Sequence, residues 1–465
     1  MTTHNYDHCN GEVAVVVVPL PAQGHLNQLL QLSRLVTTYG IPVHYVGFTN
    51  HNRQAKARVH GWDPQNSSLI RFHDFQLSSN LVNALSTSTD DVHSTSKFPA
   101  HLQPVFEAAG YLQQPVSTLL WALAEEFKRV VVVHDSLMGS VIQDVRLISN
   151  AESYTFHTVS AFALFFYIWE LAGKPLQLDD DDVPKEIPPN EGCFTSDFSD
   201  FMAKQYTYLS LSSGRLYNTS RSIEDKYMDL LQKLPMNLNK KLYAVGPLNP
   251  VIVTGKRKHR CLDWLDKQPV NSVLYVSFGT TTSFSGEQIK ELAKGLEQSE
   301  VRFIWVFRDA DKTPGVEEGR RIDDVAPAFE ERVKDRGMVV RDWAPQLEIL
   351  GHSSTGGFLS HCGWNSCMES VSMGVPMAAW PIHSDQPKNT VLVTQVLRVG
   401  IAVKDWECRE KVVTASAVEN AVRRLMASDE MRRRAHELAG RVQGSVAPGG
   451  VSHLEMDSFI AHITR

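Results

Sequence analysis

"WAPQLEILGHSSTGGFLSHCGWNSCMESVSMGVPMAAWPIHSDQ", residues 343–386, contains the pattern of a buried strand, a glycine turn and a helix in one run. The apolar piece "TGGFLS" is followed by "HCGW" and then by "CMESVSMG", which has helical spacing. We expect the strand to end before His361 and the helix to begin at Asn365 or Ser366. Ligands of open α/β sheets bind beyond the carboxyl ends of the strands, so the pattern predicts a ligand-binding turn.

Strand and helix patterns alternate along the rest of the chain. The apolar runs "EVAVVVVPL", "IPVHYVGF", "RVVVVHD", "SVLYVSFG" and "VRFIWVFR" alternate with the helical patterns "HLNQLLQLSRLV" and "GEQIKELAKGLEQS". Such continuous β-branched runs are typical of parallel strands covered on both faces, which predicts a doubly wound α/β fold. The pattern begins at Val13 and again at Val273. We therefore expect two similar domains, residues 1–250 and 251–465, that face each other across a cleft.

Composition excludes several classes of partner. The 465 residues include 46 Lys and Arg against 52 Asp and Glu, and a net charge of −6 favours neither nucleic acid nor an anionic membrane surface. The polar start lacks the basic end of a signal peptide, and "VAVVVVPL" is too short to cross a bilayer. Six cysteines without a C-x-x-C pair fit reduced thiols. We expect a cytoplasmic protein without a membrane anchor.

Two charged runs carry no predicted function. The basic cluster "KRKHR", residues 256–260, falls in a proline-containing stretch that we interpret as a solvated linker between the domains, near residues 248–262. The acidic run "LQLDDDDVPKEIPPNEGCF", residues 176–194, lacks the alternation of a calcium-binding loop and is interpreted as an exposed loop.

The polar turn allows two interpretations of its hydroxyl and carboxylate. Ser366 and Glu369 have the S-x-x-E spacing of a capping box, which would satisfy the free amides at the start of the helix. Alternatively, the same amides and the helix dipole bind a phosphate group. The sequence pattern alone leaves both open.

The same turn holds residue types that occur in metal sites. His361, Cys362 and Cys367 are close in sequence, but the C-x4-C spacing and the lack of a second distant pair argue against zinc. Trp364 would by default belong to a core, yet a glycine turn at the ligand edge of a sheet is a poor place for burial. A ligand-facing tryptophan is therefore the alternative.

The run at residues 343–386 resembles the signature box of the plant UDP-dependent glycosyltransferases, from its first tryptophan to its last glutamine. The pieces "PAQGHLNQLLQLSRL" and "VLYVSFGT" extend the resemblance over both halves of the chain. The resemblance implies a GT-B architecture of two Rossmann-like domains. The acceptor would bind mainly to the first domain and the nucleotide sugar mainly to the second, and the last helix would pack back on the first domain.

The resemblance also implies a binding site for UDP-glucose, with roles taken by motif position. The uracil and ribose would be bound by Trp343, Ala344, Gln346 and Glu369. The diphosphate would be bound by His361, Asn365 and Ser366. The hexose would be positioned by Trp364, Asp385 and Gln386, and Ser277 of "VLYVSFGT" would complete the donor site. A carboxylate such as that of Glu369 offers two acceptor oxygens for the two ribose hydroxyls.

A candidate base lies in the first half of the chain. "PAQGHLNQ" puts His25 just after a strand at the predicted ligand edge, where a neutral imidazole can accept a proton near pH 7, although a histidine there could simply begin a helix. The resemblance implies that His25 is the general base. Asp135, at the end of "RVVVVHD", would bond its other nitrogen, as in a hydrolase triad, while neighbouring His134 has no assigned role. Many relatives carry proline where this chain has Gln28.

The implied reaction is a single displacement that inverts an α-linked donor into a β-glucoside, without a protein nucleophile, metal or cofactor. The first-half pieces, such as "KARVHGWDP" and "YAVGPLNP", are most similar to the family members that glucosylate zeatin, which implies the side-chain hydroxyl of zeatin, including its cis isomer, as acceptor. Gln386 stands where relatives using UDP-glucose tend to carry glutamine. We expect a monomer.

Two alternatives remain. A glucosyltransferase of flavonoids or other phenols would share every donor residue. A non-catalytic protein that binds sugar nucleotides would keep the donor site, but the presence of both His25 and Asp135 argues against it. The carboxylate pair expected in most glycosidases is not evident.

Overall fold

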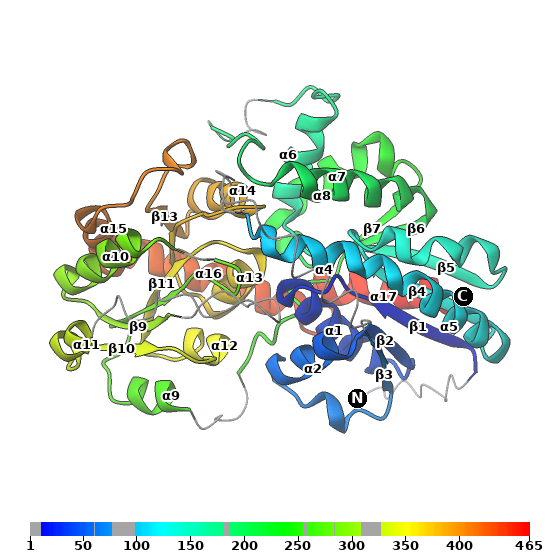
Figure 1. Cartoon of the computed structure of the whole chain (residues 1–465), viewed down its shortest axis with the longest axis horizontal. Helices are drawn as coiled ribbons and strands as arrows, with labels where there is room; N and C mark the ends of the chain where they lie inside the picture. Colours follow the sequence, from blue (N-terminus) through cyan, green and yellow to red (C-terminus); the bar gives the residue numbers. More distant parts are fainter. Residues whose placement is uncertain are drawn as a thin grey trace.

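The computed structural model describes residues 11–59, 61–76, 98–179, 184, 186–253, 259–282, 284–307 and 327–465. The polar start, residues 256–258 of the basic cluster and residues 180–183 and 185 of the acidic run lie outside the described residues. The described strands form two parallel sheets, one in each half of the chain (Figure 1). The predicted doubly wound α/β class is confirmed.

The first sheet has seven strands in the order β3-β2-β1-β4-β5-β6-β7. Its strands are β1 (Val13–Val18), β2 (Val43–Phe48), β3 (Ile70–Phe75), β4 (Arg129–Asp135), β5 (Ala151–His157), β6 (Ser212–Tyr217) and β7 (Lys241–Ala244). The helices of this half are α1 (Gln23–Thr37), α2 (Thr49–Arg58), α4 (Gln103–Ala108), α5 (Gln113–Glu126), α6 (Ala161–Leu171), α7 (Ser196–Tyr206) and α8 (Arg221–Lys233). The runs predicted as strands around β1, β2 and β4 are therefore strands.

Both faces of the first sheet are covered, which explains the continuous valine run in β1. One face packs against apolar side chains of α1, α2 and the carboxy-terminal helix α17 (Val451–Ile463). The other face packs against α4, α5 and α7. All six residues of β1 are buried because side chains on both sides of the strand enter a core.

The second sheet has six strands in the order β10-β9-β8-β11-β12-β13. Its strands are β8 (Val273–Ser277), β9 (Arg302–Val306), β10 (Gly337–Val340), β11 (Thr355–Ser360), β12 (Met377–Ala379) and β13 (Gly400–Ala402). Its helices are α9 (Arg260–Leu265), α10 (Gly286–Ser299), α11 (Pro327–Val333), α12 (Gln346–Leu350), α13 (Trp364–Met373), α14 (Gln386–Val391), α15 (Ala415–Ala427) and α16 (Asp429–Val446). Helices α10, α11 and α15 cover one face, and α9, α12, α13 and α16 cover the other.

The order of the strands reverses once in each sheet, and these two points locate the site. In the first sheet the reversal lies between β1 and β4, and in the second between β8 and β11. Neighbouring connections leave in opposite directions at such a point and open a crevice beyond the carboxyl ends of the strands. His25 follows β1 and Asp135 ends β4, while Ser277 ends β8 and His361 follows β11. The fold alone therefore brings these four residues to crevices.

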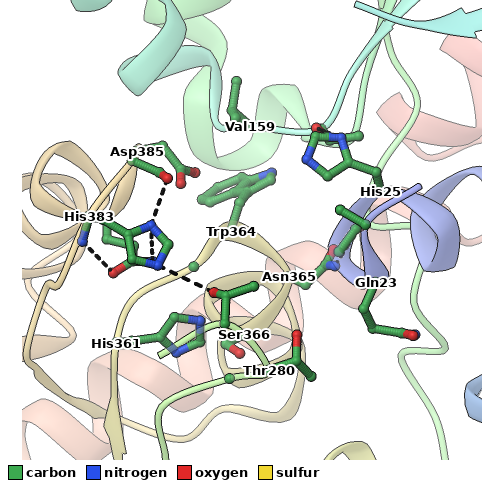
Figure 2. A pocket seen from close by; sticks show the side chains of 18 of the residues that line it. Gln23, His25, Val159, Thr280, His361, Trp364, Asn365, Ser366, His383 and Asp385 are labelled. Carbon is green, nitrogen blue, oxygen red and sulfur yellow. Dashed lines mark hydrogen bonds between the residues drawn. The ribbon is translucent and has the colours of Figure 1, made fainter. Parts of the chain in front are cut away.

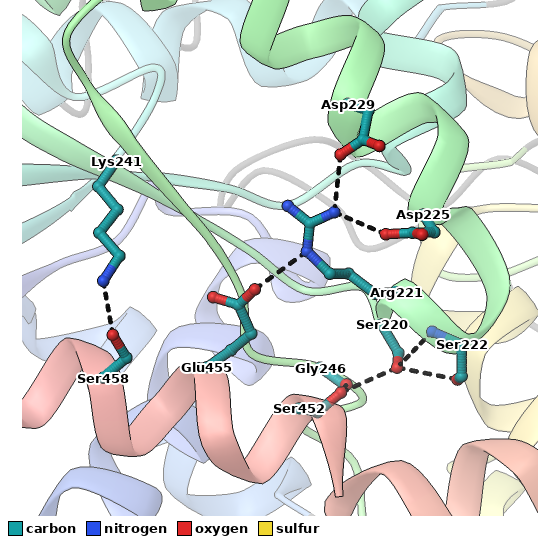
Figure 3. Close-up of polar contacts among 10 residues, drawn as sticks. All are labelled: Ser220, Arg221, Ser222, Asp225, Asp229, Lys241, Gly246, Ser452, Glu455 and Ser458. Carbon is teal, nitrogen blue, oxygen red and sulfur yellow. Dashed lines mark hydrogen bonds and ion pairs between the residues drawn. The ribbon is translucent and has the colours of Figure 1, made fainter.

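The carboxy-terminal helix α17 belongs spatially to the first domain, where the red end of the chain lies in Figure 1. Phe459, Ile460 and Ile463 enter the same core as β1 and β4. Figure 3 shows the polar contacts along this helix: Arg221 of α8 donates from Nε to Glu455 at 3.0 Å, and Ser452 donates to the carbonyl of Gly246 at 2.6 Å. The chain thus crosses between the domains a second time before it ends.

None of the helices within the described ranges combines the length and the apolar character that crossing a bilayer requires.

Candidate active site

A cavity of about 360 Å³ lies between the two domains and is lined by residues of both. Figure 2 shows His25, from α1, on one side of this space, with Trp364, His383 and Asp385 from the second half of the chain opposite. Its lining includes every residue predicted for the donor site, namely Ser277, Trp343, Ala344, Gln346, His361, Trp364, Asn365, Ser366, Glu369, Asp385 and Gln386. The predicted residues, spread over more than 100 positions, are thus brought together.

His25 and Asp135 form a close pair at the carboxyl ends of β1 and β4. His25 lies in the first turn of α1, and its Nδ1 is 2.6 Å from Oδ2 of Asp135. The Asp135 side chain is fully buried, and its other oxygen accepts a hydrogen bond from the backbone N–H of Leu137 at 2.9 Å. About a quarter of the His25 side chain is exposed. A buried carboxylate therefore holds an imidazole at the wall of the cavity.

The pair fixes the protonation of His25. Because Oδ2 of Asp135 can only accept, Nδ1 carries the hydrogen in neutral His25 and Nε2 is left to accept a proton. Burial lowers the pKa of His25, but the charge and hydrogen bond of Asp135, with the charge of Asp385, outweigh it, so the pKa is raised above the ordinary value. The ring is thus suited to accept a proton and to be stabilised once charged.

Two polar residues next to His25 were not predicted as part of the site. The Oγ1 of Thr158, directly after β5, is 3.1 Å from Nδ1 of His25. Gln28 of α1 donates to the carbonyl of Thr158 at 2.9 Å and accepts from Nδ2 of Asn218 at 2.9 Å. Gln28, the position noted as a departure from many relatives, therefore ties α1 to the ends of β5 and β6. The signal for Thr158 was its place after a strand.

Of the two interpretations of the turn after β11, the capping box is wrong. Helix α13 begins at Trp364, not at Asn365 or Ser366, and its N-cap is Gly363, which has no side chain to accept a hydrogen bond. Ser366 lies within the first turn, too late to cap it. The first N–H groups of a helix have no partner inside the helix, so this terminus is available to an anion.

Ser366 and Glu369 instead share a partner from α12. Nε2 of Gln346 donates to Oγ of Ser366 at 3.0 Å and to Oε2 of Glu369 at 2.7 Å. Only 4% of Glu369 is exposed, but the residue lines the cavity. The three side chains therefore form one polar network at the wall where the ribose was predicted to bind.

His361 is held in a narrow space between two glycines. A Cβ at Gly279 would lie 2.7 Å from Nε2 of His361, and one at Gly363 would lie 2.5 Å from the same atom. Both distances are shorter than real Cβ contacts, so the ring requires glycine at these two positions. Burial lowers the pKa of His361 to about 4, so the imidazole is neutral at pH 7 and can donate one hydrogen bond.

Trp364 and Asn365 reach across to the first domain. Trp364 is buried, contrary to the expectation from its glycine turn, and its Nε1 donates to the carbonyl of Asn218 at 2.7 Å. Nδ2 of Asn365 donates to the carbonyl of Gly24 at 2.8 Å, beside His25. Both hydrogen bonds join the start of α13 to the first domain, at the end of β6 and at the start of α1, which carries the candidate base.

The residues at the end of the signature run lie around the start of α14. Burial raises the pKa of Asp385 to about 6, although a hydrogen bond from Asn389, the backbone and the charge of His25 lower it. The Oε1 of Gln386 accepts from the backbone N–H groups of Ile382 and His383 at 2.8 and 3.1 Å. Asp385 therefore faces the cavity as a partly protonated acid near pH 6, while Gln386 holds the turn before it.

Some candidate residues lie away from this cavity. His134 is fully buried; its Nδ1 is 2.8 Å from the carbonyl oxygen of Asp135 and its Nε2 is 3.3 Å from Oγ of Ser212. Cys362 and Cys367 are buried free thiols. In the part of the chain that the structure describes, no group of three or more His, Cys, Asp and Glu side chains is arranged to hold a metal ion.

The first-domain wall of the cavity is largely aromatic and apolar. Its lining includes Phe98, Phe106, Phe194, Phe198 and Tyr206. Phe98 packs against Phe198 with 4.5 Å between the ring centroids, and the same ring meets His383 of the second domain edge-on at 5.7 Å. Such a wall suits a planar, mostly apolar ligand.

Both halves of the chain match models of glycosyltransferases. A family model described as "Glycosyltransferase, N-terminal domain" matches residues 11–250, and one described as "UDP-glucoronosyl and UDP-glucosyl transferase" matches residues 232–440. The zeatin O-glucosyltransferase of Phaseolus lunatus is 52% identical over 463 residues, covering 98% of this chain and 97% of the relative. The zeatin O-xylosyltransferase of Phaseolus vulgaris is 50% identical over 463 residues, covering 98% of each chain.

A solved structure shares the whole fold. The crystal structure of a UGT transferase from Siraitia grosvenorii in complex with UDP has a TM-score of 0.78 and 27% sequence identity, and the match covers 98% of this chain and 100% of that one. Together with the two parallel sheets, this similarity confirms the predicted GT-B architecture.

Proposed function

Because the chain belongs to the family of UDP-dependent glycosyltransferases, we propose that it transfers glucose from UDP-glucose to the side-chain hydroxyl of zeatin and inverts the anomeric carbon. The observation that carries the proposal is the pair of His25 and Asp135, which faces the predicted donor residues across one cavity. The names of two relatives that are at least half identical to this chain support zeatin as the acceptor.

The donor is bound by the second domain. Trp343 stacks on the uracil, the backbone of Ala344 bonds its edge, and Gln346 and Glu369 bind the ribose. The N–H groups at the start of α13, with His361, Asn365 and Ser366, bind the diphosphate, and Ser277 completes the donor site. The uncapped start of α13 supports this assignment, because such a terminus stabilises negative charge without a lysine.

The reaction is a direct displacement. Nε2 of His25 takes the proton of the acceptor hydroxyl as its oxygen forms a bond to the anomeric carbon. The bond from that carbon to the diphosphate oxygen breaks, and UDP leaves with the bonding electrons. The helix terminus stabilises the charge that develops on UDP, and Asp135 stabilises the imidazolium. The proposed reaction needs no metal or other cofactor, because these groups supply both the base and the charge stabilisation.

The sugar and the acceptor are specified by different walls. Asp385, Gln386 and Trp364 position the hexose, and glutamine at 386 supports UDP-glucose as the preferred donor. The aromatic wall of Phe98, Phe194 and Phe198 receives the adenine ring of the acceptor.

We also propose that the protein works in the cytoplasm as a monomer. The five cysteines in the described part of the chain are all free thiols, which fits a reducing compartment. Every predicted donor residue and both members of the candidate base pair come from this one chain.

Removal of donor contacts is expected to weaken UDP-glucose binding. Trp343→Ala should cost about 1–3 kcal/mol, the range for a base stacked on an aromatic ring. Glu369→Ala should also weaken binding because Gln346 and the ribose both lose their acceptor. No loss of helix capping is expected. Calorimetric titration with UDP-glucose measures both effects, and Trp121→Ala, at an exposed tryptophan of α5, serves as the control. Unchanged affinity in both variants would contradict the assigned donor site.

The acceptor is tested by the presence of one hydroxyl. Incubated with UDP-glucose, the protein should convert zeatin to an O-glucoside and should leave a cytokinin without the side-chain hydroxyl unreacted, because His25 then has no proton to accept. Mass spectrometry identifies the products, and parallel reactions with UDP-xylose and with phenols measure the preference for sugar and acceptor. Glucosylation of a ring nitrogen at the same rate, or reaction of phenols alone, would show that zeatin is not the acceptor.

A further inference from the structure

Asn389 of α14 is a fully buried residue that contacts three parts of the site. Its Nδ2 donates to Oδ2 of Asp385 at 2.8 Å and to the carbonyl of Cys362 at 2.9 Å. Its Oδ1 accepts from Oγ of Ser160 at 2.6 Å. Cys362 lies in the turn between β11 and α13, and Ser160 belongs to the first domain. The amide of Asn389 therefore joins Asp385, which is assigned to the hexose, the turn that precedes the proposed diphosphate site, and Ser160 of the first domain.

The orientation of this amide follows from its partners. Oγ of Ser160 accepts from the backbone N–H of Ala163 at 3.0 Å, as the N-cap of α6, so its own hydrogen is directed to Asn389. The other two partners are the carbonyl of Cys362 and the ionised carboxylate of Asp385. Both groups can only accept hydrogen bonds, and Nδ2 has two hydrogens to donate to them. A reversed amide would place its oxygen against two acceptors. The observed arrangement satisfies both amide hydrogens and the oxygen.

We propose that Asn389 is a positioning residue for sugar transfer, which holds the carboxylate of Asp385 toward the sugar and fixes the turn at Cys362 against the first domain. The inference rests on the proposed function, because Asp385 is the residue assigned there to the hexose. It extends that function to a residue beyond the signature run, which ends at Gln386.

The hydrogen bond from Asn389 affects the charge state of Asp385, and through it the activity. Burial raises the pKa of this carboxyl to about 6, and the hydrogen bond from Asn389 is the strongest influence that lowers it. The titratable groups that interact with its charge are His25 of α1, Cys193 before α7 and Cys367 of α13. Removing the donor therefore raises the pKa, so that less Asp385 is ionised near pH 7.

Lys388 and His383, which lie near Asn389 in the sequence, have other polar partners. Nζ of Lys388 donates to the carbonyl of Pro188 and to Oδ1 of Asn190, at 3.0 and 2.6 Å. The ring nitrogens of His383 lie near the hydroxyls of Ser384 and Thr281, at 2.7 and 3.3 Å. Asn389 therefore supplies a side-chain hydrogen bond to the Asp385 carboxylate.

The test combines a pH profile with a double-mutant cycle. Asn389→Ala should lower kcat/KM for UDP-glucose by about 10- to 100-fold at pH 7, the range for loss of a hydrogen bond to a buried charge. Its fall in kcat/KM on the acid side should move to higher pH, and part of the loss should be recovered at pH 8. In an Asp385→Ala background the same substitution should lower kcat/KM by a clearly smaller factor than in the unaltered protein, because coupled residues are not additive, and the remaining loss reports the contacts of Asn389 with Cys362 and Ser160.

Matched variants separate positioning from folding. Asn237→Ala removes another buried asparagine, which donates to the carbonyl of Leu231 at 2.7 Å, and should lower the melting temperature without a change in the pH profile. Asn389→Asp keeps the size of the side chain and replaces the alanine variant in the test if that variant does not fold. It should show the same acid-side shift. Two results would overturn this inference alone. One is a pH profile of kcat/KM for the Asn389 variants that equals the profile of Asn237→Ala. The other is full additivity of the effects of Asn389→Ala and Asp385→Ala on kcat/KM. Absence of glucose transfer by the unaltered protein would overturn the proposed function and this inference with it.

Discussion

His25→Ala is expected to lower kcat for glucose transfer by about 10²–10⁴-fold, the usual contribution of a general base. Without the imidazole, the acceptor hydroxyl has to attack the anomeric carbon while it still holds its proton. The affinity for UDP-glucose should stay nearly unchanged, because the assigned donor residues come from the second domain. The variant therefore separates catalysis from donor binding.

Steady-state kinetics with saturating zeatin and a calorimetric titration with UDP-glucose measure the two quantities. His352→Ala is the matched control, since this histidine lies after α12 with its Nε2 3.2 Å from Asp266 and does not line the cavity. The control should transfer glucose at the normal rate. Near-normal turnover by His25→Ala would falsify the assignment of the base.

Asp135→Asn is expected to reduce kcat by a similar factor, about 10²–10⁴-fold, although the side chain keeps its size. Oδ1 of Asp135 accepts from the N–H of Leu137, so the new amide keeps its oxygen there and turns its NH2 group to His25. Nδ1 of His25 then has to accept, and the hydrogen of the neutral ring moves to Nε2. A ring in this tautomer cannot take the acceptor proton at Nε2.

The remaining activity of Asp135→Asn carries a second signature. The charge and hydrogen bond of Asp135 raise the pKa of His25, so their loss lowers it. Since the base acts in its neutral form, the acid-side fall in kcat/KM should move to lower pH. Circular dichroism checks that the variant folds. An unchanged profile with full activity would show that Asp135 does not control the protonation of His25.

Much of the fold could be predicted because its signals are local. The valine run of β1 and the helical spacing of α1 and α10 depend on neighbours in sequence, and the structure has strands and helices there. The strand ends that carry His25, Asp135 and His361 follow from the same patterns together with the rule for α/β sheets. The resemblance then added the roles of residues that no pattern distinguishes.

The misjudged features depend on contacts between distant parts of the chain. Trp364 is buried, and its indole N–H donates to the carbonyl of Asn218, 146 residues earlier, a contact that the composition of the turn does not reveal. Ser366 and Glu369 have capping-box spacing, but both side chains accept hydrogen bonds from Gln346 of another helix. The role of Gln28 does not follow from its neighbours in sequence, because its two partners lie just after β5 and β6.

The position of α17 has a consequence for exchanging parts between members of this family. The first domain of this protein is discontinuous along the chain, because its core is completed by Phe459, Ile460 and Ile463 at the other end of the chain. A chimera cut once near residue 250 would join a foreign first domain to this helix and would mismatch the apolar surface and the ion pair of Arg221 with Glu455. A recombinant that is to keep the core of the first domain intact has to take two segments, residues 1–250 and residues 451–465, from the same parent.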